Sequence, residues 1–188
     1  MRHLALPALT LLSLVACSSG GREVYFVDPQ PALVKVGERL PLKASPAQGT
    51  ESAPTWEVVE LEGGTLLKSQ GWQVTYQAPA VAGRYRIALN GTDAKGRKQR
   101  QITEVEVQPV ITMEPANLTL APGASRSLQA KVRGSSKVVL HWAVEEDQGG
   151  TVTQDGTYTA PAIPGTYHVT ATGELPWGIQ AIATIRVQ

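Results

Sequence analysis

Short runs of alternating apolar and polar residues recur along the chain after residue 17. In VVLHWAVEE, residues 138–146, one face of the expected strand carries the larger apolar side chains, which are Val138, Leu140, Trp142 and Val144. The runs GTYHVTAT (residues 165–172) and IQAIATIRV (residues 179–187) alternate in the same way. Runs of this period that end at PG, GG or DG pairs are typical of β-strands, and no stretch shows a convincing helical period. The pattern therefore predicts an all-β fold.

The same pattern is written twice in the chain. TYTAPAIPGTYHVTAT, residues 157–172, repeats TYQAPAVAGRYRIALN, residues 75–90, at an offset of 82. Nearer the N-terminus the offset is 86, which pairs Trp56 with Trp142 and the GGT at Gly63 with the GGT at Gly149. Offsets that change only in polar or Gly-rich stretches indicate loop-length differences between two copies of one fold.

Two copies predict two domains, residues 24–108 and 109–188, joined at Gln108–Pro109 with almost no linker. About seven short strands in a copy of this length are typical of an immunoglobulin-like β-sandwich. Trp56 and Trp142 would each supply a large apolar side chain to one core. The fold class predicted is thus two tandem immunoglobulin-like β-sandwiches.

Tyr85 and Tyr167 occupy matched positions just after a Pro- and Gly-containing corner. Immunoglobulin-like sandwiches place a tyrosine at this point, and its hydroxyl bonds back to the backbone a few residues upstream. Gly83 and Gly165 suit the tight bend before it. The repeated phrase therefore predicts a folding device and not a site of chemistry.

The second copy resembles a known family of domains. ITMEPANLTLAPGASRSLQAKV, followed by LHWAV, GGTVTQDGTYTAPAIPGTYHVTAT and a closing AIATIRV, is similar to bacterial Ig-like domains. Such domains occur in tandem in intimin- and invasin-type surface proteins and in many envelope lipoproteins. The first copy is divergent, with VKVG where the second has LAPG. The resemblance implies a disulfide-free sandwich used for adhesion, spacing or docking, and it implies no catalytic residues.

The N-terminus reads as a targeting signal. Arg2 precedes an apolar run, residues 4–16, that is too short for a membrane-spanning helix and ends at Cys17, the single cysteine of the chain. LVAC, residues 14–17, resembles the lipobox of bacterial lipoproteins, which implies a signal peptide of residues 1–16 and acylation of Cys17. The alternative is an ordinary secretory signal with an incidental cysteine.

A lipidated Cys17 would hold the chain on a membrane through residues 17–23, which form a short flexible tether. Ser18, where a retained lipoprotein of enteric bacteria would carry Asp, favours the outer membrane. The predicted location is the bacterial cell envelope, with the chain anchored by palmitate or related acyl chains at the outer membrane.

Charge and residue content exclude several functional classes. The net charge of +1 gives no general attraction to nucleic acid. No Ser-His-Asp or Cys-His set is evident, neither remaining histidine has an obvious acidic partner, and no glycine-rich phosphate loop opens a helix. We therefore expect no enzymatic activity, no catalytic residues, no cofactor and no small-molecule substrate.

His141 and His168 are the two histidines that remain after the signal. Both would point outward on neighbouring strands, where they could face each other and bind a transition metal weakly with Glu145 nearby. A solvated surface is the alternative that we favour, so no metal site is predicted. The acidic run EED, residues 145–147, lacks the spaced ligands of a calcium loop and is expected to be a solvated loop.

Two tips are candidates for partner contact. KGRKQR, residues 95–100, lies on the last hairpin of the first copy, so its basic side chains could touch an anionic partner or keep an edge strand soluble; they are Lys95, Arg97, Lys98 and Arg100. Trp177, between Pro176 and Gly178, sits at the matching tip of the second copy. It would either anchor an interface or fold back over the end of the sandwich.

The function predicted is that of a lipid-anchored, non-enzymatic envelope protein whose Ig-like domains form a binding or structural module for adhesion or docking. The alternative is an accessory lipoprotein subunit of a larger envelope machine for secretion, pilus assembly, motility or outer-membrane assembly. The expected partners are the membrane, through the lipid, and an envelope protein or surface polysaccharide.

Overall fold

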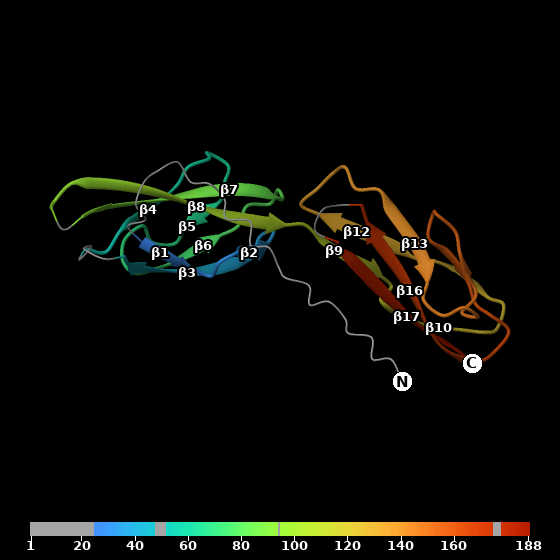
Figure 1. Ribbon diagram of the computed structural model, residues 1–188. Coiled ribbons are helices and arrows are strands. Elements are labelled where there is room, and N and C mark those ends of the chain that lie inside the picture. The colour runs from blue at the N-terminus through green and yellow to red at the C-terminus, as the bar shows by residue number, and fades with distance from the viewer. Residues whose placement is uncertain (1–24, 48–51, 94, 175–177) are drawn as a thin grey trace, which may run out of the picture.

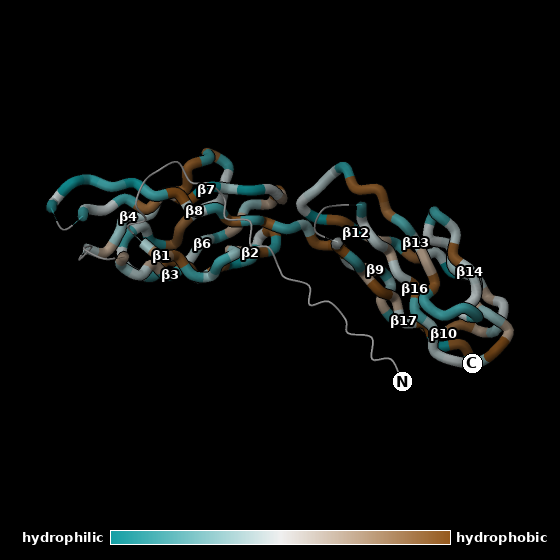
Figure 2. The backbone as a smooth tube through the Cα atoms, viewed as in Figure 1, coloured by the Kyte–Doolittle hydropathy of each residue, from teal (hydrophilic) through white to brown (hydrophobic). Residues whose placement is uncertain are grey.

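The computed structural model describes residues 25–47, 52–93, 95–174 and 178–188, and all regular structure among them is β-strand. Two sandwiches lie end to end, each with its own apolar interior (Figure 1). Apolar and polar segments alternate along both halves (Figure 2). The prediction of an all-β, immunoglobulin-like fold is confirmed. Among the described residues there is no helix with the length and apolar character needed to cross a membrane.

The first half packs one sheet against another. One sheet has the order β1-β3-β6-β5 and consists of β1 (Tyr25–Asp28), β3 (Arg39–Pro46), β6 (Gln73–Gln77) and β5 (Thr65–Leu66). The other has the order β2-β8-β7-β4 and consists of β2 (Ala32–Lys35), β8 (Lys98–Gln108), β7 (Gly83–Thr92) and β4 (Thr55–Val58). The pairs are antiparallel except for β2 with β8. Inward residues of both sheets form the core, which includes Tyr25, Trp56, Ile87 and Val105.

The second half repeats this arrangement. One layer holds β9 (Val110–Glu114) paired with β12 (Gln129–Arg133). It also holds a sheet of the order β11-β15-β14, which consists of β11 (Ser125–Ser127), β15 (Thr157–Thr159) and β14 (Thr151–Val152). The other layer has the order β10-β17-β16-β13 and consists of β10 (Asn117–Leu120), β17 (Gln180–Val187), β16 (Gly165–Gly173) and β13 (Leu140–Val144). Its core includes Leu128, Tyr158, Val169 and Ile185.

Each half has more strands than the sequence pattern indicated, because its first strand is split; in the second half the counterpart of β3 is also divided, into β11 and β12. β1 pairs with β3 in one layer, whereas β2 pairs with β8 in the other. β9 and β10 divide in the same way between β12 and β17. The break falls at Pro29 and Pro31 in the first half and at Pro115 in the second, each preceded by a cis peptide bond. Proline has no N–H to donate to a ladder, which favours a break in the pairing at these positions.

Both tyrosine corners predicted from the repeat are confirmed. The hydroxyl of Tyr85 donates to the carbonyl of Val81 at 3.0 Å, and that of Tyr167 donates to the carbonyl of Ile163 at the same distance. Neither Gly83 nor Gly165 has positive φ, so the bend before each tyrosine does not depend on the left-handed conformation that glycine favours. A Cβ on Gly165 would lie 3.0 Å from the hydroxyl oxygen of Tyr167, so this glycine makes room for the tyrosine ring.

A second pair of tyrosines, which the sequence analysis did not single out, lies deeper. Tyr76 and Tyr158 are fully buried, and their hydroxyls donate to the carbonyls of Gly63 and Gly149. Burial raises the pKa of both, that of Tyr158 to about 12. These bonds satisfy the one polar group of each ring and hold the GGT turn against the core.

The two halves touch at their junction. β8 runs into β9 with only Pro109 between them (Figure 1). The N–H of Ala82 donates to the carbonyl of Gly134 at 2.8 Å, and Val110 packs against the first core. Gly134 has φ of +93°, and a Cβ there would lie 2.5 Å from Cγ1 of Val36. The contact of the halves is therefore close at this glycine.

Candidate functional site

The edge of β13 is the first candidate site. The N–H of Glu145 donates to the carbonyl of His168, and the N–H of Glu174 donates to the carbonyl of Val139. Because ladder bonds alternate along an antiparallel strand, the odd-numbered residues of β13 bond to β16. The N–H of Trp142 and the carbonyl of Leu140 then point to the opposite side, where the described part of the chain gives them no hydrogen-bond partner. We call these groups the open edge.

The same edge is covered in the first half. The N–H of Trp56, the counterpart of Trp142, donates to the carbonyl of Ser69 at 2.8 Å. The carbonyl of Pro54, the counterpart of that of Leu140, accepts from the N–H of Gly71 at 3.1 Å. A bridge between Thr55 and Gln70 completes the contact. The segment between β5 and β6 thus serves as an added strand on β4.

A four-residue difference explains the contrast. The offset between the copies falls from 86 at Gly63 to 82 at Ala78, so the second copy is four residues shorter over this stretch. Trp56 is 3% exposed, and its indole N–H donates to the carbonyl of Gly71 at 2.8 Å. Trp142 packs on its core but is only partly buried, and no hydrogen bond of its indole is found among the described residues. The covering residues of the first half lie in the stretch that is shortened in the second half.

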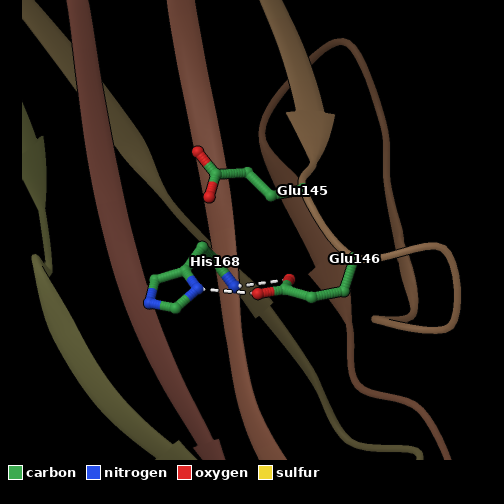
Figure 3. A group of neighbouring side chains, drawn as sticks. All are labelled: Glu145, Glu146 and His168. Carbon is green, nitrogen blue, oxygen red and sulfur yellow. Dashed lines mark hydrogen bonds and ion pairs between the residues drawn. The ribbon is translucent and has the colours of Figure 1, made fainter.

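The second candidate site is a cluster of three side chains at the end of β13, which are Glu145, Glu146 and His168 (Figure 3). One carboxylate oxygen of Glu146, Oε2, accepts the backbone N–H of His168 at 2.9 Å. The other, Oε1, lies 2.7 Å from Nδ1 of the same residue. Glu145 lies directly opposite His168 across the ladder, and each of the three residues offers an oxygen or nitrogen within 4.8 Å of the other two.

The contact of Glu146 with His168 has a counterpart in the first half. The carboxylate of Glu60 accepts hydrogen bonds from the backbone N–H of Arg86 at 2.8 Å and from the Nε–H of the same residue at 2.7 Å. Burial raises the pKa of each glutamate, but the bonds from Arg86 or His168 more than compensate, so both pKa values lie below the usual one. We call this arrangement the carboxylate clamp. It is structural in both halves, because it fixes the loop after β4 to the paired strand β7, and the loop after β13 to the paired strand β16.

Several expectations about the histidines need correction. His141 and His168 are on paired strands and point outward, but they do not face each other, because His141 lies opposite Thr172. His168 lies opposite Glu145, four residues further along, which is about 13 Å at the usual rise of a strand. Each histidine also has an acidic partner, Glu174 for His141 and Glu146 for His168, contrary to what the sequence indicated.

The EED run is not simply a solvated loop, because Glu146 is half-buried and bonded while Glu145 and Asp147 are exposed. The missed clamp did leave a signal in the sequence. Glu60 and Glu146 match at the offset of 86, and Arg86 and His168 match at the offset of 82. Neither match alone shows that the two positions meet across the sheet.

The basic hairpin joins β7 and β8, and all four of its predicted contact residues are exposed. Two of them already have partners, since Arg97 pairs with Asp93 at 2.7 Å and Arg100 with Glu57 at 3.0 Å. Lys95 and Lys98 make no ion pair among the described residues. β2 pairs only with the Val105–Gln108 end of β8. Partner contact by the four basic residues stays a prediction, as does that of Trp177.

Asp93 is expected to hold the turn of this hairpin to unusually low pH. The backbone N–H and guanidinium of Arg97, with the N–H of Lys95, lower its pKa from 3.8 to about 2. Because the folded pKa is depressed, these bonds are present at neutral pH and are lost as the pH falls through about 2. In an NMR titration the amides of Lys95 and Arg97 should shift with a midpoint near 2, and Asp93→Asn should abolish the step. A midpoint near 4 would contradict the assignment.

Two predicted site residues, Cys17 and Trp177, lie outside the described residues.

Comparisons with known proteins bear on the fold. No family model and no curated protein matches the chain. A C-terminal fragment of intimin, solved in complex with the intimin-binding domain of the translocated intimin receptor, is 15% identical with a TM-score of 0.53. The match covers 86% of this chain and 62% of that one.

Two further structures match at lower TM-scores. Drosophila N-cadherin EC1-4 is 16% identical, with a TM-score of 0.36 and coverage of 83% of this chain and 46% of that chain. Fibronectin(III)-like modules of Clostridium thermocellum CbhA are 14% identical, with a TM-score of 0.36 and coverage of 87% and 92%. The chain thus spans less than two thirds of the intimin and N-cadherin fragments. At this identity the likeness to intimin shows the fold alone, which is that of immunoglobulin-like β-sandwich domains.

Proposed function

We propose that this chain is a lipid-anchored, non-enzymatic docking module of the bacterial cell envelope, and that its second half binds a partner protein by strand addition at the open edge. The observation that carries the proposal is the contrast between β4 and β13. An exposed strand edge presents unpaired N–H and C=O groups that can pair with an extended segment of another chain. The first half closes this edge with its own residues, and in the second half no residue of the described ranges does so.

The charges along β13 indicate which segment would fit. Lys137 lies three residues before β13, His141 lies within it and Glu145 directly follows it, and all three are exposed. Val139, also exposed, is 59% accessible and offers an apolar contact. An antiparallel partner strand would therefore carry acidic residues at its C-terminal end, opposite Lys137, and a basic residue at its N-terminal end, opposite Glu145.

A lipid anchor at Cys17 would place this edge away from the membrane. A lipidated Cys17 would precede β1 by a tether that spans at most about 25 Å. The first half then stands next to the bilayer, and the second half, joined to it by β8 and β9, projects beyond. A docking surface on the distal half suits either a stand-alone module or an accessory subunit of an envelope machine, and the identity of the captured protein distinguishes them.

Hydrogen exchange tests the open edge directly. In the free protein the amide of Trp142 should exchange at least about tenfold faster than that of Trp56, which is bonded to Ser69. The amides of Ala143 and Glu145, which face β16, serve as internal controls and should be protected. Equal protection of the two tryptophan amides would show that the edge is already covered and would contradict the proposal.

Capture from membrane extracts tests the docking itself. Ala143→Lys adds a charge on the outward face beside the open edge, whereas Thr55→Lys adds one beside the covered edge of β4. A protein retained by the parent and by Thr55→Lys, but lost with Ala143→Lys, is the expected result, together with protection of the Trp142 amide in the complex. Capture that is equal with both variants, or that leaves this amide unprotected, would contradict docking at β13.

A further inference from the structure

We propose that Glu145, Glu146 and His168 form a binding site for zinc, a function separate from the docking proposed above. Two carboxylates and an imidazole are ligand types that zinc accepts. Calcium prefers oxygen ligands throughout, so the imidazole disfavours it. Three protein ligands leave at least one coordination position for water or for a group of another molecule.

The geometry prepares two of the three ligands. The carboxylate of Glu146 is held by the backbone N–H of His168 through Oε2, so Oε1 stays directed at Nδ1, 2.7 Å away. An ionised carboxylate only accepts hydrogen bonds, so Nδ1 carries the proton between them. Zinc would take the place of this proton and bind Oε1 and the freed Nδ1 together; a neutral ring then carries its proton on Nε2 instead, whereas an imidazolium releases the Nδ1 proton to solvent.

The third ligand completes the site with small movements. Donor atoms around a tetrahedral zinc with bonds of about 2.0–2.1 Å lie about 3.3 Å apart. The cluster atoms lie within 4.8 Å of one another, so a rotation of the exposed Glu145 side chain closes the remaining distance. The side chains of His168 and Glu146 are 36% and 34% exposed, which gives an ion access from solvent.

The first half serves as an internal control for this inference. It keeps the carboxylate clamp, with Glu60 and Arg86, and the N–H of Val59 donates to the carbonyl of Arg86 at 2.9 Å as that of Glu145 does to His168. The clamp therefore needs neither an imidazole nor a second carboxylate. The second half has both, because His168 stands where Arg86 does and Glu145 where Val59 does. These two differences together turn a structural clamp into a set of metal ligands.

Isothermal titration with zinc chloride tests the site on the chain from Ser18 onward, which keeps every described strand and omits the Cys17 thiol. One zinc ion per chain is expected. His168→Arg and Glu145→Val each install the residue of the first half, so both variants should fold. Loss of a residue that only supports a metal ligand typically weakens metal affinity by about 10–100-fold. Each of these variants removes a proposed ligand itself, so each should weaken zinc binding by more than that.

His141→Ala is the matched control, because it removes the other imidazole and its contact with Glu174 but no proposed ligand. It should leave zinc affinity within about twofold. Urea unfolding of each variant confirms that the fold is kept. Parent-like affinity in His168→Arg or Glu145→Val, no binding by the parent, or an equal loss in His141→Ala would each overturn the site.

Discussion

Trp56→Ala should lower the free energy of unfolding of the first half by about 3–5 kcal/mol. The ring is 3% exposed in the centre of the core, and its indole N–H bonds to Gly71 in the segment that covers β4. The substitution therefore leaves a cavity and also removes a contact that closes the edge. The loss for Trp142→Ala should be smaller by about 1 kcal/mol or more, because Trp142 is partly exposed and no described residue accepts a hydrogen bond from its indole.

The two variants can be compared in one chain. Urea unfolding followed by amide NMR signals reports each half separately, which matters because two domains need not unfold together. The loss for Trp56→Ala should appear in the signals of residues 25–108, and the smaller loss for Trp142→Ala in those of residues 109–188. Equal losses for the two tryptophans would contradict the contrast between a covered and an open edge.

Gly150→Ala should lower the free energy of unfolding of the second half by about 2–5 kcal/mol, from the cost of a positive φ together with overpacking. Gly150 has φ of +91°, and a Cβ there would lie 2.2 Å from the carbonyl oxygen of Thr159. Because this oxygen belongs to the backbone, no side-chain rotation relieves the overlap. Gly64 occupies the same position in the first half, with φ of +92° and a Cβ 2.4 Å from the carbonyl oxygen of Gln77.

Gly123→Ala is the matched control for this prediction. Its φ is +73°, but no atom lies within 4 Å of an added Cβ, so only the cost of the backbone conformation, about 1–2 kcal/mol, should remain. The same urea titration measures both variants. A loss for Gly150→Ala no larger than that for Gly123→Ala would show that the turn yields and that the close approach is unimportant.

The fold was readable in the sequence because burial and backbone geometry leave periodic traces. Alternation along residues 138–146 predicted which side chains of β13 face the core, and the burial pattern agrees. The matched Tyr85 and Tyr167 predicted the corners, since a tyrosine at this point has a defined hydrogen-bond partner within a few residues. Local sequence was sufficient wherever both partners of an interaction lie close in the chain.

The candidate sites depend on contacts between distant residues, which the sequence does not locate. The outward direction of His141 and His168 was predicted, but their separation depends on the register of β13 with β16, which alternation alone does not fix. The offset change from 86 to 82 was visible, but the cover that Ser69 and Gly71 place over β4 became evident only in the structure. Glu146 was missed for the same reason, because its partner His168 is 22 residues away.

The proposed anchor at Cys17 is tested most directly by metabolic labelling with palmitate in bacterial cells that express the full chain. The parent chain should incorporate the label and fractionate with membranes, and Cys17→Ser should lose both the label and the membrane association. An unlabelled parent chain, or label that persists in Cys17→Ser, would contradict the central claim that this sandwich pair is held at the envelope by lipid on its single cysteine.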